Sequence, residues 1–147
     1  AQSLQLDAAR AVAQSAPALE LDMRLDLGAR ATEALEAGLA LTFIVEWQLD
    51  DGRLLSERVA LRYSPLLRSY ALAVGVGAPQ TFNLRNSMLA AFEHLRLHWD
   101  SSAACTRNCQ GRVRVRLDLA ALPAPLRLPA LLDSAWSFDS RWQASTP

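Results

Sequence analysis

Apolar and polar residues alternate in several short runs along the chain. The clearest run extends from Leu19 to Leu27, where apolar residues occupy every odd position and charged residues lie between them. A second run, from Val113 to Leu119, alternates in the same way. Successive side chains of a β-strand point to opposite faces, so both runs predict strands with one face in the core. Shorter runs predict further strands at residues 2–8, 70–74 and 135–142.

A hairpin is predicted around the turn sequence Asp50-Asp51-Gly52, which separates the β-rich segments 39–49 and 54–63. The apolar residues that define both segments have odd numbers, so odd residues pair with odd residues and the loop contains an odd number of residues. A shift by one residue would mix apolar and charged side chains on each face. The pairs that we expect are Val45 with Val59, Phe43 with Leu61 and Glu46 with Arg58.

Two segments favour helices instead of strands. Residues 29–37 are rich in helix-forming residues, and Gly38 is well placed to end this helix in the left-handed conformation. A second helix is expected over residues 84–98, with Asn83 as its N-cap. Its apolar stripe has helical spacing and comprises Met88, Phe92, Leu95 and Trp99.

These elements predict a single domain of the mostly β class over residues 1–147. About seven half-buried strands separated by turns need a second layer to cover their apolar faces. We therefore expect an antiparallel β-sandwich with two helical insertions. The alternative is an α+β fold in which both helices cover one face of a single sheet.

The charge of the chain argues against some classes of function. The sequence has 15 basic and 15 acidic residues, so its formal net charge is zero, and every basic residue is arginine. Nucleic-acid-binding domains usually carry a basic excess, so we expect no nucleic-acid partner. No apolar run reaches the roughly 18 residues that a membrane-spanning helix needs, so we expect no transmembrane segment.

No catalytic or cofactor-binding motif is visible. The sequence lacks the Gly-x-Ser-x-Gly elbow of serine hydrolases, and its two histidines lie in no catalytic motif. Gly75 and Gly77 are not followed by the lysine of a phosphate-binding loop. We therefore assign no catalytic residue and no cofactor, and we favour a protein that is not an enzyme.

The order of the elements resembles the exported bacterial proteins of the domain of unknown function 4390 family. The resemblance covers residues 4–142, and the following segments carry it: the helix end Ala34-Leu35-Glu36-Ala37-Gly38, the strand from Leu39 to Trp47, Arg62-Tyr63-Ser64-Pro65-Leu66 with Tyr70, the helix 84–95, Arg112 to Leu119, Leu122-Pro123-Ala124-Pro125-Leu126, and Ser134 to Trp142. It implies a protein that carries a signal peptide and resides in the periplasm or elsewhere in the envelope after that peptide is removed. It implies no activity.

The start of the sequence bears on the same question. Ala1-Gln2-Ser3 lacks an initiating methionine, which fits cleavage of a signal peptide after a small residue. An engineered start would explain this beginning equally well. The expectation of export therefore rests mainly on the resemblance.

Cys105 and Cys109 depart from the pattern of that family, so any role for them is local to this chain. In an oxidising compartment this pair predicts a disulfide that closes a short loop. The alternative is a zinc site that combines both cysteines with His94 and His98, which are four residues apart on the expected helix. We favour the disulfide and assign no metal.

An arginine row is the candidate binding surface. Arg112, Arg114 and Arg116 alternate with apolar residues, so their guanidinium groups stand on one face of a strand in a row about 13 Å long. Arginine binds carboxylates and phosphates through paired hydrogen bonds, which suits an acidic protein segment or anionic lipid headgroups. The alternative is an ordinary solvated strand face, balanced by the acidic residues at 20, 22 and 26.

Two functional hypotheses follow. The first is a non-enzymatic interaction or accessory module that binds an envelope protein or a membrane-associated complex. The second is a small-ligand-binding protein or a hydrolase whose site is not visible in the sequence. A concave pocket with ionisable groups, above all one holding His94 or His98, would favour the second hypothesis. An exposed apolar or charged strip would favour the first.

Overall fold

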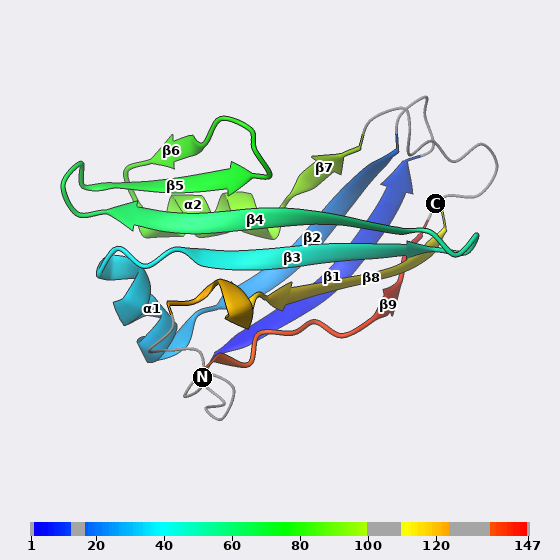
Figure 1. Ribbon diagram of the computed structural model, residues 1–147, viewed down its shortest axis with the longest axis horizontal. Coiled ribbons are helices and arrows are strands. Elements are labelled where there is room, and N and C mark those ends of the chain that lie inside the picture. The colour runs from blue at the N-terminus through cyan, green and yellow to red at the C-terminus, as the bar shows by residue number, and fades with distance from the viewer. Residues whose placement is uncertain (1, 13–16, 100–109, 124–135, 147) are drawn as a thin grey trace.

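Two antiparallel β-sheets make up most of the chain in the computed structural model, which describes residues 2–12, 17–99, 110–123 and 136–146 (Figure 1). In chain order the elements are β1 (Ser3–Val12), β2 (Ala18–Asp26), α1 (Gly28–Glu36), β3 (Leu41–Leu49), β4 (Leu54–Ser64), β5 (Ser69–Val74), β6 (Gln80–Phe82), α2 (Arg85–Glu93), β7 (Arg96–His98), β8 (Gly111–Leu117), the 3-10 helix η2 (Leu119–Ala121) and β9 (Gln143–Ala144).

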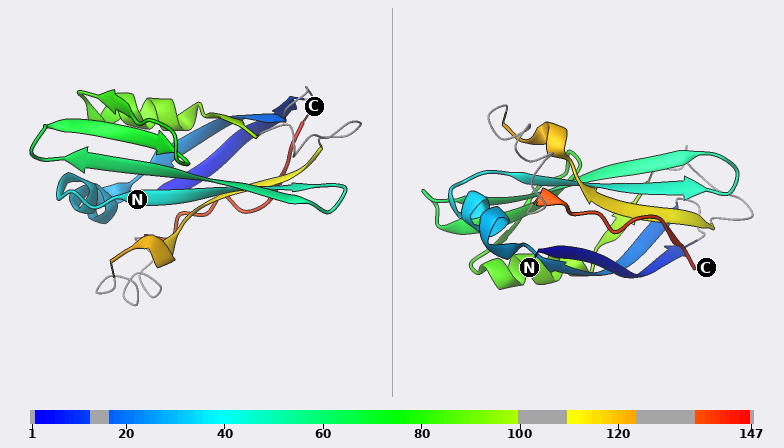
Figure 2. Two further views of the ribbon diagram at one scale, coloured as in Figure 1. Left: turned by 45° about the horizontal axis from the view of Figure 1, so that its top comes forward. Right: turned by 90° about the horizontal axis from the view of Figure 1, so that it is seen from below.

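The sheets form a sandwich, as the alternating runs predict. The smaller sheet has the strand order β1-β2-β7, and the larger one has the order β6-β5-β4-β3-β8-β9. The right-hand view of Figure 2 shows β3, β4 and β8 in one layer and β1 and β2 in the other. Helix α2 lies in the same layer as the smaller sheet and covers β5 and β6. The smaller sheet has only three strands, so it does not extend over this part of the larger sheet.

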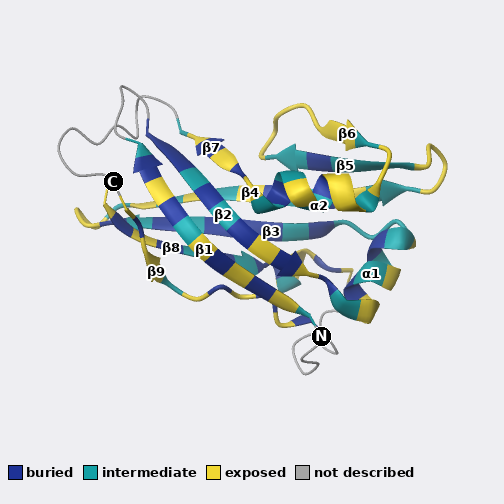
Figure 3. Cartoon of the chain, turned by 180° about the vertical axis from the view of Figure 1, so that it is seen from behind, coloured by how far each residue is buried: buried dark blue, intermediate teal, exposed yellow. Residues whose placement is uncertain are grey.

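The core lies between the two layers. Buried and exposed residues alternate along β1 and β2, which Figure 3 shows as bands of dark blue and yellow. The aromatic rings at the centre come from both layers: the ring of Phe43 on β3 lies 4.9 Å from that of Phe92 on α2, between centroids. Phe43, Trp47 and Phe92 are fully buried. No helix in the described part of the chain is both long and apolar enough to cross a membrane.

The register of the β3–β4 hairpin corrects the expected one. The observed pairs are Leu41 with Leu61, Phe43 with Val59 and Glu46 with Ser56, so the expected pairs were displaced by two residues. Odd residues still pair with odd residues, as predicted. The expected register would have required a five-residue loop, because it places Leu49 opposite Leu55. Instead the Leu49 N–H donates to the Arg53 carbonyl at 2.8 Å, and Gly52 closes a three-residue loop at φ 94°.

Helix α1 confirms the first predicted helix, and Gly38 follows it at φ 96°, in the left-handed region. Helix α2 corrects the second. It ends at Glu93 instead of residue 98, and Leu84 instead of Asn83 occupies its N-cap without a side-chain hydrogen bond. The following residues form β7, which pairs with β2 in the smaller sheet. The free edge of β2 therefore recruits residues that local spacing assigns to the helix.

The C-terminal segment 138–146 runs beside β8 and then crosses to the other sheet. The Leu117 N–H donates to the Phe138 carbonyl, and the Thr146 N–H donates to the Ala9 carbonyl on β1, both at 2.8 Å. The segment therefore joins one edge of the larger sheet to β1 of the smaller one. This corrects the strand expected at 135–142: in its described part, residues 136–142, only an isolated bridge at Asp139 forms. Regular extension is interrupted at Arg141, whose φ is 60°.

Candidate functional site

The outer face of the six-stranded sheet carries the arginine row. Strand β8 pairs with β3, so each arginine faces an outward residue of its neighbour: Arg112 faces Gln48, Arg114 faces Glu46 and Arg116 faces Ile44. On its other side Ile44 faces Arg58 of β4. Two cations therefore flank an isoleucine across three adjacent strands: Arg116 on β8, Ile44 on β3 and Arg58 on β4.

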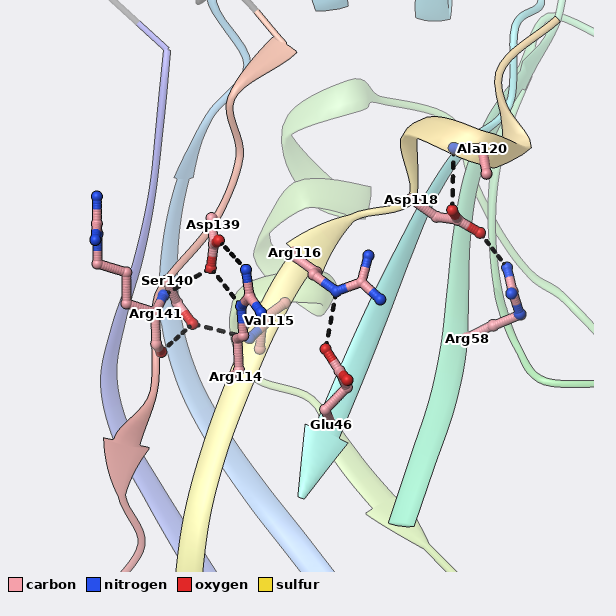
Figure 4. Close-up of polar contacts among 10 residues, drawn as sticks. All are labelled: Glu46, Arg58, Arg114, Val115, Arg116, Asp118, Ala120, Asp139, Ser140 and Arg141. Carbon is pink, nitrogen blue, oxygen red and sulfur yellow. Dashed lines mark hydrogen bonds and ion pairs between the residues drawn. The ribbon is translucent and has the colours of Figure 1, made fainter. Parts of the chain in front are cut away.

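Each of Arg112, Arg114 and Arg116 contacts a polar partner within the chain, and Figure 4 shows the contacts of Arg114 and Arg116. The Arg116 Nε donates to Glu46 Oε1 at 2.8 Å. Arg114 makes a paired contact with Asp139, in which its Nε donates to Oδ1 at 2.9 Å and its Nη2 donates to Oδ2. The Arg112 Nη2 donates to Gln48 Oε1 at 2.9 Å. The row is therefore partly neutralised by its own sheet.

The acidic residues that balance the row differ from those expected. The acids at 20, 22 and 26 belong to β2 and lie on the outer face of the smaller sheet, where Glu20 pairs with Arg10 and Arg96. Glu46 and Asp139 take that role instead. Both partners depend on which strands lie next to β8, and the sequence of the row itself does not contain that information.

Asp118 and Arg58 form a further ion pair at one end of the face. Asp118 directly follows β8 and is buried, and its carboxylate accepts from Arg58 Nη1 and from the Ala120 N–H at 3.2 Å. The Asp118 N–H donates to the Thr42 carbonyl on β3 at 2.8 Å. Sequence reasoning missed this pair, although Arg58 has the parity of the outward residues of β4.

Several guanidinium N–H groups on this face remain available to a partner. Figure 4 shows both terminal nitrogens of Arg116 turned away from Glu46, which contacts only Nε. Within the described ranges, Arg58 bonds through Nη1 alone and Arg112 through Nη2 alone. The Arg112 guanidinium also lies over Trp142, 5.6 Å from the ring centroid.

A groove of about 380 Å³ adjoins this face. It lies between β8 and the segment 136–139, and its walls combine the ion-paired side chains with two aromatic rings. The residues that line it include Arg114, Arg116, Asp118, Trp136, Phe138 and Asp139. Together, face and groove offer cations and an apolar recess to one partner.

The pKa shifts at this face describe ion pairs. The hydrogen bond from Arg114 lowers the pKa of Asp139, and the Arg141 N–H, which donates to the same carboxylate, lowers it further. A carboxyl group that acts as a general acid needs a raised pKa instead. Among the described residues the one large pKa shift lies elsewhere: burial and the hydrogen bond to Glu36 raise the pKa of Tyr70 to about 12.

This ion pair predicts a specific loss of stability in acid. The folded-state pKa of Asp139 lies below its ordinary value of 3.8, so the pair contributes fully above that pH and is lost as the pH falls through the folded pKa. Asp139→Asn should lower the free energy of unfolding at pH 7 by about 0.5–1 kcal/mol, as expected for a partly exposed pair.

Urea denaturation at pH 7 and near pH 3 measures this effect. The difference between parent and Asp139→Asn should shrink at the acidic pH, because the unfolded parent takes up a proton at Asp139 below pH 3.8 and is thereby stabilised relative to the folded state. Asp7→Asn, which breaks the exposed pair with Arg24 on the other sheet, is the matched control. A difference that stays constant with pH would contradict the assigned ion pair.

The two histidines lie on different elements. His94 follows the last residue of α2 and His98 ends β7, so the four-residue helical spacing expected for a zinc site is not formed. No group of three or more potential ligands, counted over the described part of the chain, could hold a metal ion. Cys105 and Cys109 lie outside the described residues, so the disulfide and the zinc site stay predictions.

His94 does line a second depression, of about 420 Å³, between the β5–β6 hairpin and the C-terminal end of α2. Its other walls are largely aliphatic, with Leu72, Val74 and Leu95 among them. The His94 Nδ1 lies 3.1 Å from Asp22 Oδ1, and the His94 side chain is 72% exposed. The pair therefore sits at the rim of the depression and not inside it.

Fold and site together define an antiparallel β-sandwich with a charged outer sheet face. The chain matches the family model described as Domain of unknown function (DUF4390) over residues 1–146, so it belongs to that family. This confirms the family that the order of elements indicates. No curated protein and no solved structure matches the chain.

Proposed function

We propose that this protein is a non-enzymatic interaction module of the bacterial envelope, located in the periplasm, which binds an acidic polypeptide segment. The binding surface is the outer face of the six-stranded sheet with its adjoining groove. The observation that carries the proposal is the set of guanidinium N–H groups of Arg58, Arg112 and Arg116 that point to solvent without a protein acceptor among the described residues.

The charge of this face supports the proposal. Five cations, at Arg58, Arg62, Arg112, Arg114 and Arg116, stand against three anions, at Glu46, Asp118 and Asp139. Five minus three leaves an excess of two positive charges on this face, whereas the net charge of the whole chain is zero. Such an excess attracts an acidic partner and speeds its association at low salt.

The shape of the face favours a polypeptide over a small ligand. The cations lie on β4 and β8, which flank β3 and are about 10 Å apart. An extended chain with acidic side chains can contact several of them, while its apolar residues enter the groove beside Trp136 and Phe138. The envelope location is supported by the resemblance to exported proteins.

A charge-matched variant tests the face. Replacing Arg112, Arg116 and Glu46 with glutamine removes the free guanidinium N–H groups of β8, keeps the Arg58–Asp118 pair and leaves no carboxylate without its partner. Dissociation of a fluorescein-labelled peptide of alternating glutamate and valine should be followed by fluorescence anisotropy. We expect parent binding to weaken with salt and the variant to bind at least about tenfold more weakly, which corresponds to about 1.4 kcal/mol.

The control changes the net charge equally on the other sheet. Arg10→Gln, Arg24→Gln and Asp7→Asn alter the charged outer face of β1 and β2 and also remove an exposed ion pair. This control should bind the peptide like the parent. Equal binding by parent and sheet-face variant would refute the proposal. If the parent does not bind the peptide and its binding to anionic vesicles is lost in the sheet-face variant, the face binds lipid instead.

A small-ligand site remains the second candidate, because His94 and Asp22 lie beside an apolar depression. Both side chains are open to solvent, which is poor shielding for a general base. Apart from His94, the lining mixes aliphatic side chains with Gln80 and Arg96, so it suits binding of a small molecule better than chemistry. The geometry therefore supports the interaction module better.

A further inference from the structure

The turn between β4 and β5 presents two adjacent leucines to solvent at one end of the sandwich, the left end in Figure 1. Leu66 is 91% exposed and Leu67 is 74% exposed. Leu84, just before α2, is 65% exposed and lines a shallow pocket together with Tyr70, which lies next to this turn (Figure 3 shows the exposed residues in yellow). Single exposed leucines are common on protein surfaces, but two adjacent ones with a third nearby form a patch that calls for a ligand.

The β4–β5 turn has a defined, hydrogen-bonded conformation. The Leu67 N–H donates to Ser64 Oγ at 3.3 Å, and Arg68 adopts φ 52°, a left-handed conformation that arginine rarely takes. The turn rests on a firm base, because the rings of Tyr63 and Tyr70 stack at 4.6 Å between centroids. The backbone therefore holds both leucines outward instead of letting them fold back onto the sheet.

Polar contacts tie this base to both helices. The Tyr70 hydroxyl donates to Glu36 Oε1 at 2.6 Å, and the Arg85 Nη1 donates to the same oxygen at 2.8 Å. Glu36 belongs to α1 and Arg85 to α2. These contacts connect the base of the turn to both helices, so the turn has a rigid support for docking.

The charge around the patch is positive. Arg68 adjoins the leucines in the turn, and Arg62 points outward near the end of β4. Neither forms an ion pair with another described residue. The nearest acid, Glu36, is already engaged by Tyr70 and Arg85. Exposed aliphatic side chains flanked by unpaired arginines match the chemistry of an anionic membrane surface.

We propose that the β4–β5 turn docks the protein on an anionic lipid bilayer. Leu66 and Leu67 enter the boundary between headgroups and acyl chains, while Arg68 contacts lipid phosphates. The large apolar side chains exposed in the turn are both leucines. Protein hot spots favour aromatic side chains that fill pockets, so a bilayer suits the turn better than a protein partner. Two leucines give weak, reversible binding. The proposal is independent of the sheet face.

Co-sedimentation with vesicles tests the docking. The vesicles contain equal parts of phosphatidylglycerol and phosphatidylcholine, or phosphatidylcholine alone. We expect the parent to bind the anionic vesicles and to leave the neutral ones largely free. Leu66→Asn with Leu67→Asn should lower the partition coefficient at least tenfold, and Arg68→Gln should lower it less and reduce its salt dependence. The melting temperature should stay within a few degrees of the parent, because both leucines are exposed.

Val76→Asn is the matched control, since Val76 is fully exposed at another turn and belongs to no patch. It and the sheet-face triple variant should both bind anionic vesicles like the parent. Parent-like binding by the double leucine variant would overturn the proposal, as would an equal loss in Val76→Asn or a parent that binds neither vesicle. Loss in the sheet-face variant alone would place the lipid site on the sheet.

Discussion

Gly111→Ala should destabilise the protein by about 3 kcal/mol, the upper range for overpacking at a rigid site. A Cβ atom on Gly111 would lie 2.0 Å from the Gln48 carbonyl oxygen and 2.9 Å from the Leu49 Cα. Both are backbone atoms of β3, so no side chain can move aside. The start of β8 must separate from β3, which breaks the ladder that places the arginine row. Urea denaturation followed by circular dichroism measures the loss.

Gly52→Ala is the control for this prediction. Gly52 has φ 94°, but an added Cβ would meet no atom within 4 Å. Its cost is therefore backbone strain alone, about 1–2 kcal/mol for a residue with a Cβ in the left-handed region. If Gly111→Ala costs no more than Gly52→Ala, the close approach of β3 and β8 at this point is wrong.

Trp47 should show a large difference between two truncations. Trp47→Ala should cost about 3–5 kcal/mol, because the residue is fully buried and its ring packs against that of Trp99. Trp47→Phe should cost less than about 1.5 kcal/mol. Its Nε1 is buried without a hydrogen-bond partner in the described structure, and removing that donor recovers part of the lost packing energy.

The same denaturation experiment measures both variants, with Trp99→Phe as the control. The Trp99 Nε1 donates to the Ser56 carbonyl at 3.3 Å. Trp99→Phe therefore loses a hydrogen bond, whereas Trp47→Phe removes a buried donor that has no partner in the described structure. A cost for Trp47→Phe close to that of Trp47→Ala would mean that the indole N–H has a partner in solution.

Local alternation predicted the elements whose two faces differ clearly. Strands β2 and β8 and the β3–β4 hairpin follow from it, because one face must be apolar and one polar. The segment after α2 was ambiguous. Leu95 continues the helical stripe of Met88 and Phe92, but Leu95, Leu97 and Trp99 also alternate as in a strand. Pairing with β2, more than seventy residues away, decides between them.

The candidate site was predictable only in its first layer. The alternation along the sequence predicted that Arg112, Arg114 and Arg116 share one face of a strand, and the pairing of β8 with β3 agrees with this. Their partners were not visible, because the chain inserts β8 beside β3 and then brings Asp139 back alongside it. Asp139 lies in a segment whose alternation predicts a strand but does not indicate which strand it lies beside. The position of Arg58 opposite Ile44 could not be predicted either, because it depends on the hairpin register, which the turn geometry decides.

The crossing of the C-terminal segment from β8 to β1 has a consequence for the order of folding. The contact between Ala9 and Thr146 spans 137 positions of the sequence. Until residues 138–146 are available, β1 and β8 each present an open edge, and the two sheets are not joined along this side. Contacts of such long range are slow to form. A chain with this topology therefore cannot close its sandwich before residues 138–146 have been synthesised.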